Sequence, residues 1–199
     1  IIATGASAMW LGLESEKRLI GKGVSSCAVC DGFFFKGKNV LVVGGGDTAM
    51  REAQYLSKVC KSVAVVHRRD KLRAQSVLVS LVKSKPNVKF IFNSMIDEVL
   101  GQGEVIGVRL KNTQTGEISQ LEVDGIFVAI GHKPNTNFLK GQIDLDEKGY
   151  VVVHDETRTA VEGVFVAGDV ADYKYRQAVT AAGAGCKATF DAEEYLENL

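Results

Sequence analysis

The chain has 199 residues, in which 24 Lys and Arg balance 24 Asp and Glu, so the formal net charge is zero. A neutral protein is not a general binder of nucleic acid or anionic membranes, because both gain affinity from excess positive charge. Hydrophobic residues make up 46% and charged residues 24%, which is ordinary for a folded globular protein and excludes extensive disorder. No apolar run reaches the ~18 residues of a membrane-spanning helix.

The first residues are typical of a strand that runs into a turn, and the chain starts with Ile1 rather than Met. We therefore expect the chain to begin inside a larger protein, with any targeting signal upstream. No signal-peptide pattern is present at the start. The expected location is cytoplasmic, with an organelle as the open alternative.

Strands and helices are expected to alternate along the chain. Short apolar runs between turn residues predict buried strands, and apolar residues spaced three to four apart predict helices. In chain order, the expected elements of the first part are strands at 39–43, 63–66 and 88–92, helices at 47–59 and 76–83, a hairpin of 98–110 with 117–123, and a strand at 125–130. Those of the second part are strands within 144–154 and at 163–167, and a helix at 177–196. The alternation predicts an α/β fold with a parallel sheet.

A glycine-rich loop follows the strand expected at 39–43. Gly44, Gly46 and Ala49 fit G-x-G-x-x-A, a dinucleotide-binding pattern, in its required place between a strand and a helix. The glycines permit a tight turn and close approach of a pyrophosphate, and the helix N-terminus presents free N–H groups to it. The alternative is a turn that binds no ligand. The predicted cofactor contacts in this loop are Gly44, Gly45, Gly46, Asp47 and Thr48.

A basic segment follows the next expected strand, with His67, Arg68 and Arg69 in a row and Arg73 one helical turn further on. NAD sites usually carry Asp or Glu about 20 residues after the glycines, to hold the ribose 2′-hydroxyl, and no carboxylate stands there. Guanidinium groups instead suit a 2′-phosphate, by paired charge-assisted hydrogen bonds. The segment therefore predicts NADPH rather than NADH, with His67 as a capping or stacking residue. A solvated basic turn is the alternative.

Cys27 and Cys30 form a C-x-x-C pair that Asp31 follows directly. We interpret the pair as a redox dithiol/disulfide, because this spacing closes a small ring that forms and breaks readily. Asp31 is the candidate proton donor and acceptor, and a turn residue otherwise. Zinc is disfavoured, because there is no second C-x-x-C and the histidines are scattered, and two unreacted thiols are the other alternative. Cys60 and Cys186 are interpreted as buried packing thiols.

A hydride donor and a disulfide do not exchange electrons readily, and a flavin between them is the usual physical solution. Gly168 and Asp169 end a predicted strand, where a carboxylate could hold a ribityl hydroxyl. Arg176, Gln177 and Ala178 open the last helix, whose N-terminus could face the electron-rich edge of a flavin. Each of these stretches also fits a plain turn with a helix cap.

Together these stretches resemble the low-molecular-weight, NADPH-dependent thioredoxin reductases along nearly the whole chain. The stretches that carry the resemblance are S-C-A-V-C-D-G (26–32), V-V-G-G-G-D-T-A (42–49), H-R-R-D-K-L-R-A (67–74), A-I-G-H-K-P-N (129–135) and 163–185. The resemblance implies a Rossmann-like NADPH-binding domain (10–130) inserted into an FAD-binding domain (1–9 and 131–199). It also implies a homodimeric flavoprotein that reduces thioredoxin with NADPH through FAD and the Cys27–Cys30 disulfide.

The resemblance also implies roles for individual residues. Cys27 would attack the thioredoxin disulfide, Cys30 would face the flavin, and Asp31 would be the acid and base. Ile130 and Gly131 would join the cofactor contacts, and no metal is expected. The implied FAD contacts are Gly168, Asp169, Arg176, Gln177 and Ala178.

One part of the family pattern has no counterpart in residues 1–43, namely the first third, whose G-x-G-x-x-G holds the FAD pyrophosphate. We therefore expect an incomplete FAD domain, and a chain that as given binds FAD weakly or not at all and turns over poorly. Two alternative functions remain open. One is a related flavin disulfide reductase for a peroxiredoxin or another partner, and the other is a non-enzymatic NADPH-binding remnant.

Overall fold

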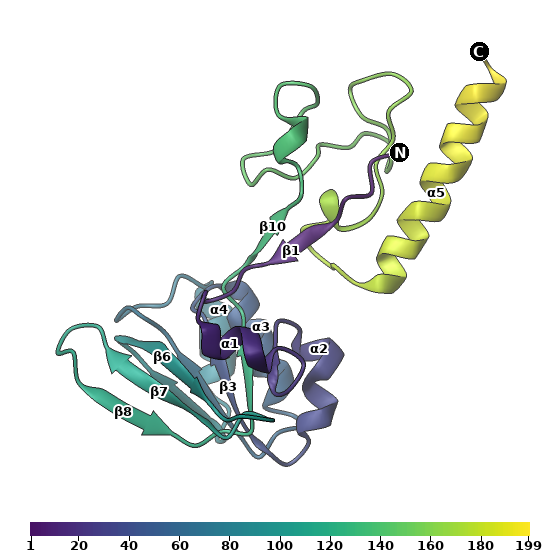
Figure 1. The fold of residues 1–199 in the computed structure, drawn as a ribbon. Helices are drawn as coiled ribbons and strands as arrows, with labels where there is room; N and C mark the ends of the chain where they lie inside the picture. Colours follow the sequence, from purple (N-terminus) through teal and green to yellow (C-terminus); the bar gives the residue numbers. More distant parts are fainter. The chain divides into compact units, whose positions relative to one another are not determined.

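A computed structural model describes all 199 residues and divides them into two compact units (Figure 1). Met9–Gly131 form what we call the central unit. Ile1–Ala8 and His132–Leu199 together form the outer unit, so one continuous segment interrupts the outer unit in sequence.

The central unit is built on a five-stranded parallel sheet with the order β2-β9-β3-β4-β5. Its strands are β2 (Val24–Ser25), β9 (Gly125–Val128), β3 (Asn39–Val43), β4 (Ser62–Val66) and β5 (Val88–Ile91). The strands are almost continuously apolar, as expected of a parallel sheet that is covered on both faces. The parallel sheet predicted from the alternating pattern is thus confirmed.

The two faces of this sheet have different covers. Val40, Val42 and Phe127 pack on the apolar face of α3 (Asp47–Leu56), with α4 (Ser76–Lys83) beside it. Leu41 and Ile126, which point the other way, pack against a second sheet and α1 (Glu14–Leu19). A short turn of helix, α2 (Ala28–Asp31), and the 3-10 helix η1 (Gly32–Phe35) lead into β3.

The second sheet is antiparallel and consists of β6 (Ser94–Leu100), β7 (Gly107–Asn112) and β8 (Ile118–Leu121). The single strand expected at 98–110 is wrong, because the chain turns back after Leu100. Gly101 makes this turn at φ 132°, where a Cβ would lie 1.8 Å from the Glu104 carbonyl oxygen. The turn was missed although 101–104 is Gly-Gln-Gly-Glu, because apolar residues on either side of it, such as the buried Val105, continue the strand-like pattern.

The outer unit contains less regular structure. β1 (Ala6–Ala8) pairs antiparallel with β10 (His132–Pro134). The remaining elements are the 3-10 helices η2 (Asn137–Leu139) and η3 (Gly168–Val170) and the long helix α5 (Ala178–Glu197), yellow in Figure 1. The expected strands within 144–154 and at 163–167 are wrong. Only isolated bridges form there, such as Leu145 with Val151 and Ile2 with Val166, because no neighbouring segment runs alongside far enough for a ladder.

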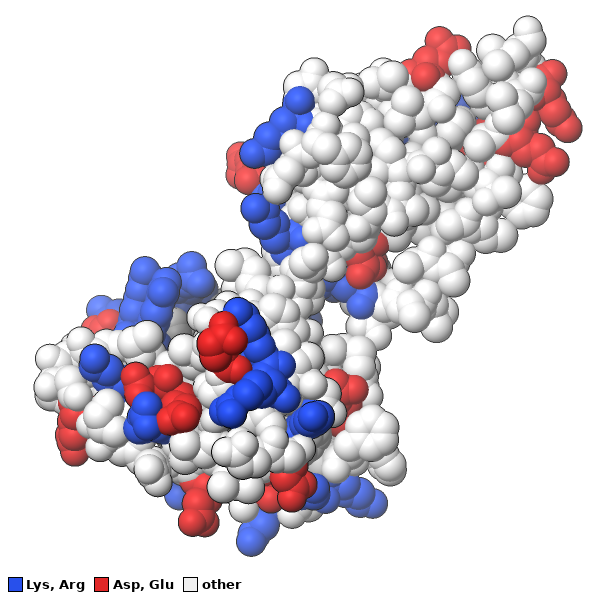
Figure 2. All heavy atoms as spheres, viewed as in Figure 1, with Lys and Arg blue, Asp and Glu red and all other residues white.

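Charges of both signs are present on the visible face of each unit (Figure 2), in keeping with the zero net charge. None of the helices has the length and the apolar character needed to cross a bilayer.

Candidate redox and nucleotide site

Cys27 and Cys30 form a disulfide, and their Cα atoms are 5.3 Å apart. Cys27 is the residue before α2 and Cys30 lies in its single turn, so the helical spacing brings the two sulfurs together. The Sγ of Cys27 also accepts a hydrogen bond from the backbone N–H of Cys30, at 3.2 Å. Cys30 is exposed and Cys27 is half-buried, so an outside reagent can reach the pair.

The segment that carries the disulfide is fixed to the sheet by contacts that only glycine allows. A Cβ on Gly32 would lie 2.9 Å from the ring of Tyr55, and one on Gly125 would lie 2.3 Å from the ring of Phe35. Phe35 in turn packs edge-on against Phe127, with ring centroids 5.3 Å apart. The disulfide is therefore mounted on the rigid core rather than on a free loop.

Asp31 is tied to β2 by the hydroxyl of Ser25. The Ser25 Oγ donates to the Asp31 Oδ2 at 2.6 Å and accepts from the Cys27 N–H at 3.1 Å. Ser25 is buried and Asp31 is half-buried. The sequence interpretation missed Ser25, whose only signal is its place two residues before Cys27.

Large apolar side chains are exposed on both sides of Cys30. Val29 is 61% exposed, Phe33 67% and Phe34 75%. Their place on α2 and η1 puts them next to the disulfide in the chain. An apolar surface at a reactive group is typical of a site that contacts another protein or is covered by one.

The three glycines of the loop 44–46 have different surroundings, so a side chain at each position would have a different consequence. A Cβ on Gly44 would lie 2.8 Å from the Cβ of Ala49, so small residues at both positions let α3 start close to the strand end. A Cβ on Gly45 would lie 2.4 Å from the ring of His67. At Gly46 a Cβ would meet nothing within 4 Å, so the backbone there is open to a ligand at the start of α3.

Backbone hydrogen bonds hold the basic segment against this loop. The Gly45 carbonyl accepts from the N–H groups of Arg73, at 2.7 Å, and Ala74, at 3.1 Å. The carboxylate of Asp47 accepts from the Gln75 N–H at 2.8 Å. The structure thus brings together the two motifs that were predicted separately. Thr48, which follows Asp47 in α3, is half-buried.

Arg68, Arg69 and Arg73 are exposed, and none of them pairs with a carboxylate. Three unpaired guanidinium groups near the open N-terminus of α3 make this edge of the sheet positive. Such an edge fits the phosphates of a dinucleotide.

His67 has a different position from the three arginines. Its ring is 6% exposed and packs under Gly45, with Nε2 3.1 Å from the Lys71 carbonyl oxygen. Burial lowers the pKa of His67, the hydrogen bond to Lys71 opposes the shift, and the neighbouring arginines lower the pKa further. The neutral ring therefore supports the loop from beneath, with Nε2–H as the donor to Lys71.

The last two predicted residues of the central unit lie beyond the end of β9. The strand expected at 125–130 ends at Val128, so Ile130, in a bend, and Gly131, at φ 124°, follow it outside the sheet. The Gly131 carbonyl accepts a hydrogen bond from the Met9 N–H at 2.9 Å. Both ends of the central unit are therefore joined by this bond.

In the outer unit, Gly168 and Asp169 open η3. The Oδ1 of Asp169 is buried and has no hydrogen-bond partner. Burial and the charge of Asp172 raise the pKa of Asp169, while Arg176 opposes the shift. A buried carboxylate oxygen without a partner fits a binding site in which it accepts a hydrogen bond from a hydroxyl of the bound molecule.

The start of α5 is organised by Asp172, which the sequence interpretation also missed. Its carboxylate accepts from the three successive N–H groups of residues 174–176. Burial opposes ionisation of Asp172, but these donors and the Thr180 hydroxyl outweigh it and lower its pKa. Gln177 caps the helix and Ala178 is its first residue. Asp172 therefore sets the backbone of the predicted flavin contacts.

The two remaining cysteines differ from each other. Cys60 is buried, as expected, and burial raises its pKa to about 11. The interpretation of Cys186 as a buried thiol is wrong, because this residue is exposed on α5. That helix has a single buried residue, Ala188, so most of its side chains face outward. No group of three or more His, Cys, Asp or Glu side chains is placed to hold a metal ion.

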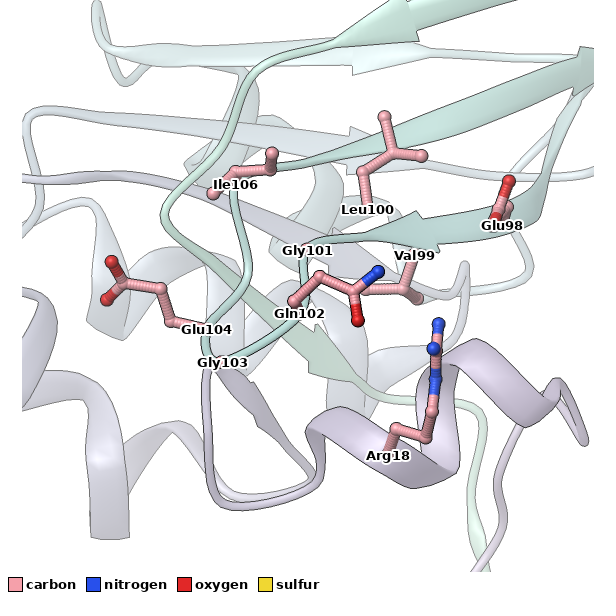
Figure 3. A pocket seen from close by; sticks show the side chains of 9 residues that line it. All are labelled: Arg18, Glu98, Val99, Leu100, Gly101, Gln102, Gly103, Glu104 and Ile106. Carbon is pink, nitrogen blue, oxygen red and sulfur yellow. The ribbon is translucent and has the colours of Figure 1, made fainter.

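The pocket in Figure 3 lies between α1 and the turn from β6 to β7, and its volume is about 760 Å³. The Arg18 side chain extends toward β6 at one side of this pocket. None of the predicted site residues lines it, and its lining contains no sulfur and no histidine. The candidate site therefore lies outside this pocket, on α2 and on the glycine loop with its basic segment.

Comparisons with known proteins agree with the geometry. A thioredoxin reductase of Streptomyces coelicolor is 52% identical over 200 residues, which cover all of this chain and 62% of the relative. A solved thioredoxin reductase of Streptococcus pyogenes superimposes with a TM-score of 0.94 at 41% identity and covers 100% of this chain and 65% of that one. A glucosaminate ammonia-lyase of Pseudomonas fluorescens is 50% identical over 208 residues, which cover 100% of this chain and 64% of the relative.

The chain thus spans 62–65% of the length of these three relatives. The resemblance to thioredoxin reductases and the FAD/NAD(P)-binding fold that it implies are confirmed over the whole chain. The sequence pattern of the family Pyridine nucleotide-disulphide oxidoreductase matches residues 1–185. With its disulfide and its dinucleotide loop in one unit, the chain belongs to the pyridine nucleotide-disulphide oxidoreductase family.

Proposed function

We propose that this chain supplies the disulfide-bearing and NADPH-binding part of a homodimeric thioredoxin-disulfide reductase. The observation that carries the proposal is the Cys27–Cys30 disulfide. Its Cys30 is exposed, and the segment that carries it packs on the core of the central unit. It lies in the same unit as the dinucleotide loop at 44–46. A unit that holds both a redox disulfide and a loop of this kind fits electron transfer from a nicotinamide to a disulfide.

The proposed dinucleotide is NADPH. The open backbone at Gly46 fits a pyrophosphate, and the unpaired guanidinium groups of Arg68, Arg69 and Arg73 fit a 2′-phosphate. His67 supports the loop from beneath as a neutral ring. Because a guanidinium gains little from an uncharged ribose hydroxyl, this arrangement favours NADPH over NADH.

The proposed flavin is FAD, which when bound relays two electrons between the nicotinamide and the disulfide. The Oδ1 of Asp169, which has no partner, could accept a hydrogen bond from a hydroxyl of such a ligand. The backbone around Arg176, which Asp172 organises, is the other element that would hold it. The proposal gives Asp169, Arg176, Gln177 and Ala178 a binding role only.

The chemistry assigned to the reduced chain is exchange of two thiols for a partner disulfide. Cys27 as thiolate attacks one partner sulfur, so a bond between the two proteins forms and the partner disulfide breaks. Cys30 then loses its proton and attacks the Cys27 sulfur, which closes the Cys27–Cys30 bond and releases the partner sulfur that was bound to Cys27. The partner sulfur released first takes up from solvent the proton that Cys27 lost on ionising, and Asp31 carries the Cys30 proton to the partner sulfur released last, so two protons accompany the two electrons.

The structure of α2 suits these assignments. The hydrogen bond from the Cys30 N–H to the Cys27 Sγ stabilises negative charge on that sulfur once the disulfide is open. The exposed side chains of Val29, Phe33 and Phe34 give a protein partner an apolar surface to contact beside the pair. A protein disulfide is therefore a better substrate than a small polar one, and we assign thioredoxin as that protein.

The test uses the reduced 199-residue chain and oxidised thioredoxin, without any cofactor. We expect the chain to lose two thiols while thioredoxin gains two. In a Cys186→Ser background, Cys30→Ser should accumulate a covalent complex with thioredoxin, and the matched control Cys27→Ser should not. If thioredoxin stays oxidised while a peroxiredoxin is reduced, the partner assignment is wrong. If Cys27→Ser forms the complex instead, the order of attack is reversed.

A further inference from the structure

We propose that Ser25 is a positioning residue for disulfide exchange, because its hydroxyl holds the Asp31 carboxylate beside the Cys27–Cys30 pair. The inference deepens the proposed function and rests on the proton-carrying role of Asp31 there. Its starting point is the single hydroxyl that contacts both ends of the C-x-x-C-D stretch, at the Cys27 N–H and at the Asp31 carboxylate.

The direction of these hydrogen bonds follows from the single proton of a hydroxyl. The Asp31 Oδ2 lies 2.6 Å from the Ser25 Oγ, whereas the Cys27 carbonyl oxygen lies 3.5 Å away, at the outer limit of a hydrogen bond. The proton therefore goes to Asp31, and the lone pairs remain for the Cys27 N–H.

Ser25 is itself held in place. It is 7% exposed, and β2 pairs with the buried strand β9 in the register Ser25 to Phe127. Its hydroxyl is the only hydrogen-bond partner of the Asp31 side chain, which forms no ion pair. Without this hydroxyl, the carboxylate is free to rotate into solvent, away from the turn that carries both sulfurs.

A proton carrier must lie within reach of both the group that loses the proton and the group that gains it. A fixed Asp31 carboxylate would meet this condition at every exchange event, since the hydroxyl that holds it also accepts from the Cys27 N–H. A rotating one meets it for only a fraction of the time. The consequence of losing Ser25 is therefore a slower exchange through Asp31, and the loss of Asp31 should leave Ser25 nothing to position.

The test is a double-mutant cycle on the reduced full chain in the Cys186→Ser background. The variants are Ser25→Ala, Asp31→Asn and the combination of both, with thioredoxin and, separately, glutathione disulfide as the oxidant. We expect each single substitution to slow exchange about tenfold, the size of one charge-assisted hydrogen bond. The double variant should be no slower than Asp31→Asn alone, because coupled residues are not additive.

A matched pair of variants separates loss of the hydroxyl from misfolding. Ser25→Thr and Ser25→Val have the same shape and differ only in the hydroxyl, so Thr should exchange within about threefold of the unchanged chain and Val about tenfold slower. Binding of NADPH at the glycine loop, which Ser25 does not contact, reports whether each variant is folded.

Three outcomes would overturn the positioning role. They are an unchanged rate in Ser25→Ala, equal rates in the Thr and Val variants, or a double variant that is slower by the product of the two single effects. The glutathione arm separates this from failure of the proposed function. If the chain reduces glutathione disulfide but not thioredoxin, the partner is wrong while Ser25 is still tested. Reduction of neither disulfide contradicts both proposals.

Discussion

The central and outer units bury their apolar residues to very different degrees. In the central unit, both faces of the parallel sheet are covered, and Leu41 and Phe127 are fully buried. In the outer unit, α5 buries only Ala188, while Val179 is 82% and Phe190 65% exposed. The comparison teaches that the central unit completes its own core, whereas the outer unit presents apolar surface that this chain does not cover.

The same contrast separates the two halves of the proposed site. The glycine loop, the basic segment and the disulfide are held by contacts within the central unit, such as those of Gly45 and Phe35. The predicted flavin contacts in the outer unit include an oxygen of Asp169 that has no partner. Experiments that change one unit at a time can therefore test whether the contrast holds in solution.

The largest effect is expected from a cavity in the central core. Leu41→Ala should lower the free energy of unfolding by about 2–5 kcal/mol, because a fully buried side chain leaves a hole. Val179→Ala on α5 should change it by only about 0.5 kcal/mol, as at an exposed position. Urea unfolding of both variants measures the difference. Equal losses would show that the surface of α5 is covered in solution.

The two free thiols provide the next comparison. The pKa of Cys60 is about 11 and its side chain is buried, whereas Cys186 is exposed. Because the thiolate is the reacting form, iodoacetamide at pH 8 should modify Cys186 more than about a hundredfold faster than Cys60. Mass spectrometry of the oxidised chain measures both rates. Cys186→Ser is the matched control, since it should leave almost no rapidly labelled thiol.

The dinucleotide preference should depend on the guanidinium groups of the central unit. Arg69→Ala should weaken NADPH binding about tenfold, which is the effect of losing one charge-assisted hydrogen bond, and leave NADH binding nearly unchanged. Arg158→Ala in the outer unit is a control with the same change of charge. Isothermal titration with both nucleotides gives the two affinities. A parallel loss of both affinities would contradict the 2′-phosphate assignment.

The smallest effect is the pH dependence contributed by His67. Its pKa is lowered by burial, so between that value and the ordinary value of about 6.5 the unfolded chain binds more protons than the folded one. The stability that His67 contributes is therefore present above about pH 6.5 and is lost as the pH falls through its folded pKa.

Urea unfolding at several pH values measures this contribution. His67→Gln should flatten the dependence below about pH 6.5. His132 in the outer unit also has a pKa lowered by burial and by Arg176, so part of the dependence should persist. An unchanged slope in His67→Gln would contradict the buried, neutral ring.

Much of the central unit was predictable, because its signals are local. The apolar run before Gly44, the small residues after it and the spacing of α4 predict a strand, a loop and helices where the structure has them. The residues that were missed act through side-chain hydrogen bonds. Ser25 and Asp172 organise their sites by bonds to groups several residues away, and no periodicity reveals such bonds.

The outer unit was less predictable for a related reason. Apolar runs at 144–154 and 163–167 have the composition of strands, but a strand needs a neighbour that runs alongside it. Val151 and Phe165 are buried without such a ladder. Cys186 was misplaced because residue type alone favours burial of a thiol, while the exposed surface of α5 follows from tertiary contacts.

The support of the glycine loop has a kinetic consequence. The carbonyl of Gly45 is held by two N–H groups of the basic segment, and the ring of His67 fills the space beneath it. A loop that is already in its binding conformation loses little chain entropy when a nucleotide arrives. Association should therefore follow a single encounter step whose rate rises linearly with nucleotide concentration and falls with added salt, without a slower rearrangement afterwards.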